Sequence, residues 1–359
     1  MTIRVLVVDD SALIRQILSK GLALDPDIDV VGTAADPYAA RDQILRLRPD
    51  VMTLDVEMPR MDGVEFLRRL MPQFPLPTVM VSSLTKRSAA TTLAALEAGA
   101  IDFVEKPTVD VAQGMKTLIR ELVGKIKVAS RAQVRHHRKD TSDVRRVVSA
   151  PVQALRSSTD KVLAIGASTG GTEAGLEVIR RLPPSCPGVV VVQHMPPVFT
   201  NLYAERLNRE CKVTAKEAVN NDRVIPGRVL IAPGGKQMRL VRTGGHFIVK
   251  LGESTKVSGH APSVDVLFES VAEQAQEHAV GVILTGMGQD GATGLLSMRR
   301  AGAYTIGQDE ATSVVYGMPK VANDLGAVQR QAGLEEIAGI ALERFRYMEE
   351  KEEVCSARI

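Results

Sequence analysis

The stretch Ile3-Arg-Val-Leu-Val-Val-Asp-Asp10 is a strand-length apolar run that ends in two acidic residues, and the helix-period segment Ala12–Leu24 follows it. The same alternation continues to about Lys127. The further strand-like runs are Val30–Thr33, Val51–Leu54, Thr78–Val81 and Ile101–Val104, and the further helix-like segments are Tyr38–Leu47, Val64–Leu70 and Ser88–Ala98. Five βα units of this spacing predict a doubly wound parallel sheet with helices on both faces.

A second α/β pattern begins at Lys161. Its strand-like runs are Val162–Gly166, Val189–Gln193, Val229–Ala232 and Val280–Thr285, and its helix-like segments are Thr172–Leu182, Asn201–Glu210 and Pro262–His278. Met238–Val241 and His246–Lys250, joined by Thr243-Gly244-Gly245, predict an added β-hairpin. We therefore expect a second doubly wound parallel-sheet domain at 161–350, following a first at 1–125.

The segment between these domains, residues 126–160, is strongly basic. Lys125 to Asp160 carries nine Lys or Arg and three Asp residues, a net charge of +6. A solvated connector explains this composition, and a basic contact for an acidic protein or a nucleic acid is the alternative. We expect a linker.

The composition excludes several classes of protein. The 359 residues carry a net charge of only +3, with no Trp and 3% aromatic residues, so nucleic-acid binding is not expected. No apolar run approaches the roughly 18 residues of a membrane span, and the first residues lack a signal peptide. We expect a cytoplasmic protein that is not embedded in a membrane.

Polar residues of the first half follow the predicted strands. Asp9 and Asp10 close the first strand, Asp55 the third and Ser82 the fourth, and Lys106 follows the fifth. Because carboxyl ends of parallel strands converge on one crevice, these groups predict a pocket. Clustered carboxylates that need a cation fit Mg²⁺, and Asp55 could then attack a phosphoryl group to form an acyl phosphate. Taken singly, the first two acids could be helix caps and Lys106 a surface residue.

Four motifs in order resemble those of response-regulator receiver domains: Val-Asp-Asp-Ser, Leu-Asp-Val-Glu-Met-Pro-Arg-Met-Asp-Gly, Val-Ser-Ser and Glu-Lys-Pro. The resemblance implies that Asp55 is the phosphorylation site and that Mg²⁺ is its cofactor. It further implies a set of residues that switch on phosphorylation and a set that binds the metal. Phe103 could also be explained as a core residue. The switch set is Ser82, Lys106 and Phe103, and the metal set is Asp9, Asp10, Asp55 and Glu57.

In the second half, Gly166-Ala167-Ser168-Thr169-Gly170-Gly171 follows a strand and satisfies G-x-S-x-G, a turn that exposes a serine hydroxyl. His194 and Asp290 also lie just past strands, where one crevice can gather all three. A serine needs an imidazole base, and that imidazole needs a carboxylate to fix its tautomer. Each residue also has a separate alternative: the glycine turn around Ser168 could bind phosphate, His194 could be a structural histidine, and Asp290 could cap a helix. The order Ser, His, Asp differs from that of α/β-hydrolases.

This half resembles the catalytic domain of chemotaxis protein-glutamate methylesterases. The matching stretches are Ala-Ile-Gly-Ala-Ser-Thr-Gly-Gly, Val-Val-Gln-His-Met-Pro, Ala-Pro-Gly-Gly, Pro-Ser-Val-Asp-Val-Leu-Phe, Leu-Thr-Gly-Met-Gly-Gln-Asp-Gly and Gln-Asp-Glu-Ala-Thr-Ser-Val-Val-Tyr-Gly-Met-Pro. The segment around Ser258-Gly259-His260 is less similar. The resemblance implies a Rossmann-like domain with Ser168 as nucleophile, His194 as base and Asp290 as orienting carboxylate.

The resemblance also implies a reaction and its partners. The backbone N–H groups of Thr169 and Met287 would form the oxyanion hole; the position directly after an elbow nucleophile supports Thr169 independently. Methylated chemoreceptor helices would be the substrate, glutamine deamidation a related activity, and a chemotaxis histidine kinase the phosphodonor. Ester hydrolysis would need no cofactor, and the unphosphorylated receiver would be inhibitory. The alternative is a response regulator whose output domain binds DNA or a nucleotide without catalysis, for which the basic segment is the main support.

Overall fold

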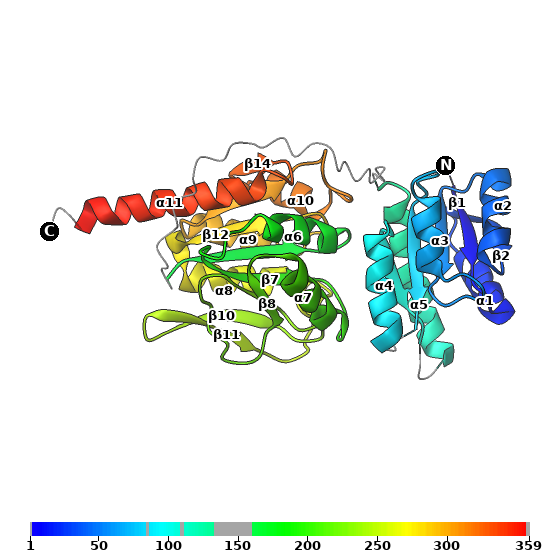
Figure 1. The fold of residues 1–359 in the computed structure, drawn as a ribbon, viewed down its shortest axis with the longest axis horizontal. Coiled ribbons are helices and arrows are strands. Elements are labelled where there is room, and N and C mark those ends of the chain that lie inside the picture. Colours follow the sequence, from blue (N-terminus) through cyan, green and yellow to red (C-terminus); the bar gives the residue numbers. More distant parts are fainter. Residues whose placement is uncertain (1, 84–85, 108–110, 133–159, 357–359) are drawn as a thin grey trace. The chain divides into compact units, whose positions relative to one another are not determined.

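The computed structural model describes residues 2–83, 86–107, 111–132 and 160–356. The chain forms two compact units, 1–143 and 144–359, each built around its own parallel sheet (Figure 1). Most of the predicted 126–160 linker lies outside the described residues. In the part of the chain that the structure describes, no helix combines the length and apolar character needed to cross a bilayer.

The first unit is a five-stranded parallel sheet in the order β2-β1-β3-β4-β5, which confirms the predicted doubly wound fold. Its strands are β1 (Ile3–Val8), β2 (Ile28–Ala34), β3 (Val51–Asp55), β4 (Thr78–Ser82) and β5 (Asp102–Glu105). Its helices are α1 (Ala12–Leu22), α2 (Pro37–Leu47), α3 (Gly63–Leu70), α4 (Lys86–Glu97) and α5 (Val111–Ala129). Every residue of β3 and β4 is buried, as expected for strands covered on both faces.

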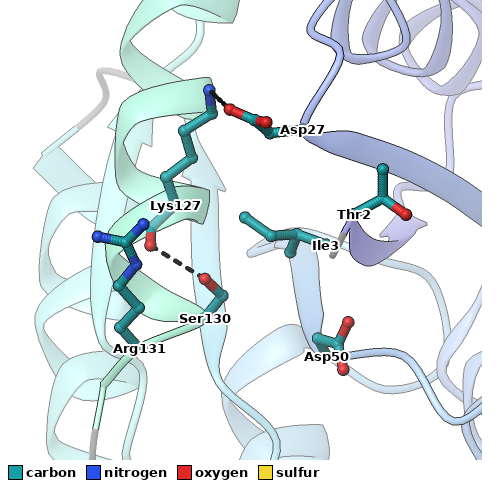
Figure 2. A pocket seen from close by; sticks show the side chains of 7 residues that line it. All are labelled: Thr2, Ile3, Asp27, Asp50, Lys127, Ser130 and Arg131. Carbon is teal, nitrogen blue, oxygen red and sulfur yellow. Dashed lines mark hydrogen bonds and ion pairs between the residues drawn. The ribbon is translucent and has the colours of Figure 1, made fainter.

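Helix α5 continues to Ala129, so the first residues of the predicted linker are helical. Lys127 Nζ ties this end of the helix to the loop before β2 through ion pairs with Asp25 (2.9 Å) and Asp27 (2.7 Å). A cavity of about 370 Å³ lies beside this contact (Figure 2). It is lined by Thr2, Ile3, Asp27, Asp50, Lys127, Ser130 and Arg131. These residues lie at the amino ends of β1, β2 and β3 or around the carboxyl end of α5, so the cavity lies at the opposite end of the strands from Asp55.

The second unit holds a seven-stranded parallel sheet in the order β14-β13-β12-β6-β7-β9-β8 (Figure 1, green to orange). Its strands are β6 (Val162–Ala167), β7 (Gly188–Gln193), β8 (Thr214–Glu217), β9 (Arg228–Ile231), β12 (Ala279–Ile283), β13 (Tyr304–Gln308) and β14 (Arg330–Ala332). Its helices are α6 (Gly171–Arg180), α7 (Phe199–Glu210), α8 (Val264–Gln274), α9 (Ala292–Arg300), α10 (Met318–Asp324) and α11 (Ile337–Ser356). Three strands on the outer parts of this sheet, β8, β13 and β14, are not among the strand-like runs of the sequence.

The predicted hairpin is present as β10 (Met238–Thr243) and β11 (His246–Leu251), which form a separate two-stranded antiparallel sheet. Its two turn residues, Gly244 and Gly245, both have positive φ (55° and 83°), the conformation that tight hairpin turns require. The backbone N–H of Leu240 donates to Ser270 Oγ of α8 at 2.9 Å. The hairpin is therefore joined to the helix that begins beside the site described below.

The core of the second unit packs α8 and α9 against the central strands. Val264, Leu267 and Phe268 of α8 lie in one buried cluster with Leu295 of α9 and Val162 of β6. Because the cluster spans helix and sheet, it fixes where α8 begins relative to the carboxyl ends of the strands.

Replacing Leu267, which is fully buried, by Ala should lower the free energy of unfolding of this unit by about 2–5 kcal/mol, because it leaves a cavity in the core. The same substitution at Leu325, whose side chain is 50% exposed, should cost less than about 1 kcal/mol. Calorimetric unfolding of the full-length variants measures both. Equal losses at the two positions would contradict the assigned core.

Candidate active site and receiver acid pocket

The candidate active site lies where the loops after β6, β7 and β12 meet. These three strands are neighbours in the sheet, and β6 pairs with β7 on one side and β12 on the other. The connections leave β6 and β12 in opposite directions along the sheet, which makes this edge a topological switch point. Main-chain hydrogen bonds hold the loops together, from Ser168 N to Thr285 O (3.0 Å) and from His194 N to Ala167 O (3.1 Å).

His194 and Asp290 form a direct contact at this switch point. His194 Nε2 lies 2.7 Å from Asp290 Oδ2, and the two side chains are only 7% and 2% exposed. Asp290 Oδ1 also accepts a hydrogen bond from Ser263 Oγ at 2.7 Å, while Oδ2 accepts one from Val264 N at 2.7 Å. Ser263 caps α8, so the carboxylate sits at a helix N-terminus, where the dipole favours negative charge.

The surroundings of Asp290 decide its ionisation. Burial acts to raise the pKa of Asp290, but the hydrogen bonds from His194, Ser263 and Val264 outweigh it and lower the pKa to about 2. The carboxylate is therefore charged at neutral pH. A charged partner holds the proton of His194 on Nε2, which leaves Nδ1 of the neutral imidazole as a base.

Nδ1 is indeed the open nitrogen of His194. It is buried and has no hydrogen-bond partner among the described residues. Ser168 directly follows β6, whose last residue Ala167 pairs with Gln193, the residue before His194. Within the described ranges Ser168 Oγ makes no hydrogen bond, so the serine-to-imidazole bond of a triad is not formed in this conformation. The fold thus joins two members of the predicted triad and places the third on the adjoining strand end.

One predicted oxyanion donor follows Ser168 in the chain, and the other belongs to a loop that packs against it. Thr169 is the next residue in the chain and is 8% exposed, and its carbonyl accepts a hydrogen bond from Thr285 Oγ1 at 3.0 Å. The backbone N–H of Met287 donates no hydrogen bond within the part of the chain that is described. Gly286 lets this loop approach, because a Cβ at that position would lie 2.8 Å from Ser168 Cβ. The Met287 N–H is therefore available on a loop packed against the serine.

Several residues that support this site were not selected from the sequence. Gln193 Nε2 donates to Ser168 O at 2.8 Å, Ser263 binds Asp290, and the ring of His260 stacks on that of His194. Ser263 belongs to a matching family motif, which was a usable signal. The position of His260 in the sequence gives no sign that its ring stacks on that of His194.

In the first unit, Asp9, Asp10 and Asp55 lie together at the carboxyl ends of β1 and β3, and carboxylate oxygens of the three lie within 4.8 Å of one another. Lys106 Nζ lies 2.8 Å from both Asp9 Oδ2 and Asp55 Oδ2. Burial raises the pKa of Asp55 to about 6 against the opposing effect of Lys106. Burial also acts to lower the pKa of Lys106, but the paired carboxylates outweigh it and raise the pKa.

This group of oxygens suits a hard divalent cation. All three side chains offer carboxylate oxygens, and Asp10 is exposed, so one side of the group is open to solvent. The carboxylate of Glu57 is not part of the group, because its Oε1 accepts a hydrogen bond from Ser88 Oγ at 2.7 Å. The donor set therefore fits Mg²⁺ without the Glu57 side chain.

The predicted switch residues lie on β4 and β5. Ser82 is fully buried, and its Oγ accepts a hydrogen bond from Thr92 Oγ1 of α4 at 2.6 Å. Phe103 is 5% exposed, and Lys125 Nζ lies 5.3 Å from its ring centroid. Ser82 is thus held by α4 and Phe103 is packed in the core, which is compatible with either a switch role or a purely structural role.

Comparison with known proteins matches both units. The family model for the CheB methylesterase covers residues 163–340, and the model for the response regulator receiver domain covers residues 5–119. A Syntrophotalea carbinolica protein named protein-glutamate methylesterase/protein-glutamine glutaminase is 58% identical over 337 residues, which are 94% of this chain and 96% of that protein. A protein of that name, numbered 2, from Syntrophomonas wolfei is 54% identical over 337 residues, 93% of this chain and 95% of the relative.

Among solved structures, the Thermotoga maritima CheB methylesterase catalytic domain is similar to this chain with a TM-score of 0.50 and 38% identity. The match covers 51% of this chain and 97% of that one. These matches give no support to a DNA- or nucleotide-binding output domain. With a receiver domain, a methylesterase domain and near full-length relatives, the chain belongs to the protein-glutamate methylesterase/protein-glutamine glutaminase family of response regulators.

Proposed function

We propose that the protein is a phosphorylation-activated carboxylester hydrolase that removes methyl groups from glutamate methyl esters on cytoplasmic helices of chemoreceptors and deamidates receptor glutamines. The observation that carries the proposal is the buried His194–Asp290 bond, which leaves Nδ1 of the imidazole without a partner among the described residues, while Ser168 follows the neighbouring strand β6. Membership of the family supports the substrate.

In this proposal Ser168 Oγ attacks the acyl carbon of the ester, and His194 Nδ1 takes the hydroxyl proton. The backbone N–H groups of Thr169 and Met287 stabilise the charge that develops on the carbonyl oxygen. The proton on His194 then passes to the departing methoxide, which leaves as methanol. A water molecule, deprotonated by the same imidazole, attacks the acyl-enzyme and releases glutamate. Each step uses side chains and backbone of this chain, and we expect hydrolysis to need no cofactor.

We further propose that Asp55 is the phosphorylation site and that a chemotaxis histidine kinase is the donor. Asp9, Asp10 and Asp55 would hold Mg²⁺, which supplies positive charge to the phosphoryl oxygens. Lys106, already within 2.8 Å of Asp55, would pair with the charge added there. The switch residues Ser82 and Phe103 would carry that change to the receiver surface, and the unphosphorylated receiver would inhibit the methylesterase domain. This substrate and donor place the protein in the cytoplasm.

Replacing Ser168 by Ala should lower kcat for ester hydrolysis by a factor on the order of 10⁴ or more, because the nucleophile is lost. Methanol release from methylated chemoreceptor membranes measures the rate. Ser297→Ala is the matched control, since within the described ranges the one hydrogen bond of Ser297 Oγ is its donation to Thr293 O in α9. Undiminished activity of Ser168→Ala would end the serine mechanism.

The proposed mechanism also requires Asp290 to stay charged beside a second acid, Asp265. The N–H of Asp265 donates to Asp290 Oδ1 at 3.2 Å, and its own Oδ1 accepts from Gly294 N at 2.8 Å. Burial, together with the charge of Asp290, raises the pKa of Asp265 to about 6. The pair is therefore arranged so that the negative charge rests on Asp290 and the more tightly held proton on Asp265.

This arrangement predicts that Asp265→Asn stabilises the fold at high pH but not at low pH. Because the pKa of Asp265 is higher in the folded chain than its ordinary value of 3.8, folding binds its proton, and the wild type loses stability as pH rises from about 4 to above about 6. Asn stays neutral and can still accept the Gly294 N–H. At pH 8 the free energy of unfolding of the variant should exceed that of the wild type by up to about 3 kcal/mol, which appears as a higher unfolding temperature. At pH 4 thermal unfolding should show no such difference. A variant that is less stable than the wild type by the same amount at both pH values would contradict this prediction.

Acetyl phosphate with Mg²⁺ should raise the rate of methanol release by the full-length protein and leave Asp55→Ala unstimulated, because the variant lacks the acceptor carboxylate. A fragment of residues 150–359 should be faster than the unphosphorylated full-length chain and insensitive to the phosphodonor. The same assay measures all three proteins. An equally slow fragment would reject autoinhibition, and stimulation of Asp55→Ala would reject the phosphorylation site.

A further inference from the structure

A second imidazole lies flat against the proposed catalytic base. The rings of His260 and His194 have centroids 3.8 Å apart and planes inclined by only 9°. His260 is half-buried and lies in the connection of residues 252–263 between the hairpin strand β11 and α8. The face of the His194 ring is therefore covered by a residue from a separate part of the chain, 66 positions away.

One buried amide holds this loop. Gln237, 6% exposed, donates from Nε2 to the carbonyl oxygens of Thr255 (2.9 Å) and His260 (3.0 Å). Val257 and His260 exchange two main-chain hydrogen bonds of 3.0 and 2.9 Å, which close the loop into a tight turn. Gln237 thus bonds the chain before the turn, at Thr255, and at the last residue of the turn, His260, and this fixes the backbone from which the His260 ring projects.

The same amide is linked to the carboxylate on the other side of His194. Gln237 Oε1 accepts a hydrogen bond from Ser263 N at 2.9 Å, and Ser263 Oγ donates to Asp290 Oδ1 at 2.7 Å. A single buried side chain thus connects the residue that stacks on the imidazole to the residue that anchors its acid partner.

The catalytic ring needs such support. Its only hydrogen bond runs from Nε2 to Asp290, while Nδ1 is buried without a partner in the described residues. A ring bonded at one atom can still tilt about that bond, and a tilt changes the direction in which Nδ1 points. A second flat ring packed at 3.8 Å opposes a tilt toward it, because that rotation brings the two rings into collision. Errors of about 1 Å in such geometry cost on the order of 100-fold in rate.

We propose that His260 is a positioning residue for the hydrolytic reaction, and that its ring, held in place by Gln237, keeps the plane of the His194 imidazole oriented with Nδ1 toward Ser168. The inference rests on the proposed function, in which His194 is the base. It assigns His260 a role through its flat face rather than through its charge or hydrogen bonds.

The test compares His260→Ala with His260→Phe in the full-length protein. His260→Ala should lower kcat for methanol release about 10- to 100-fold with KM changed less than about twofold, because orientation acts on the chemical step. His260→Phe, which keeps a flat ring but no ring nitrogen, should recover most of that loss. Gln237→Glu, which keeps the acceptor for Ser263 N but cannot donate to the two carbonyls, should follow His260→Ala. His246→Ala, at the hairpin turn, is the matched histidine control and should behave as wild type.

A proton spectrum of each variant gives a readout that does not depend on turnover. The Nε2 proton shared with Asp290 should give a downfield resonance in the wild type and in His260→Phe, and a resonance broadened by solvent exchange in His260→Ala. Wild-type kcat and a sharp resonance in His260→Ala, or failure of Phe to recover activity, would overturn the inference. Failure of the proposed function is a separate result, since it appears as activity that survives in Ser168→Ala or in His194→Ala.

Discussion

The buried negative charge of Asp290 is the constraint on which the catalytic unit depends. A carboxylate that is 2% exposed loses nearly all contact with water, and this costs several kcal/mol unless donors replace the water. Here Ser263 Oγ, two backbone N–H groups at the start of α8 and the imidazole of His194 take that place. The start of α8 must therefore lie against the loop after β12. The packing of α8 in the core against the central strands holds the helix in that position.

Both units place their reactive groups at the point where the order of a parallel sheet reverses. In the first unit the reversal lies between β1 and β3, whose ends carry Asp9 and Asp55. In the second it lies between β6 and β12, whose loops carry Ser168 and Asp290. Adjacent loops that turn away from each other leave a crevice between them, so side chains far apart in sequence meet there. One physical rule thus accounts for both candidate sites.

The same rule explains what the sequence could predict. Buried strands give continuous apolar runs, and a polar residue in the short loop after such a run lies near the carboxyl end of the strand, so Asp55, Ser168, His194 and Asp290 could all be assigned to strand ends. The outer strands β8 (TAKE), β13 (YTIGQ) and β14 (RQA) mix polar residues or glycine with apolar ones, so none of them gives a continuous apolar run. Contacts made by loops, such as the stacking of His260 and the bonds of Gln237, depend on tertiary packing that has no period along the chain. Glu57 belongs to a matching motif, yet its side chain turns to Ser88, since a motif fixes the backbone position and not the rotamer.

Asp290 and Asp55 are both buried carboxylates, but their partners shift the two pKa values in opposite directions. Asp290 is held by fixed donors on both oxygens, which lower its pKa and leave no lone pair free for bond formation. Asp55 has one long backbone hydrogen bond, from Glu57 N at 3.4 Å, and the ammonium of Lys106 on a flexible stem. Burial therefore prevails there and raises the pKa. A carboxylate that orients an imidazole must be immobile and charged, whereas one that accepts a phosphoryl group must keep an oxygen available to react, and the two sets of partners match these two requirements.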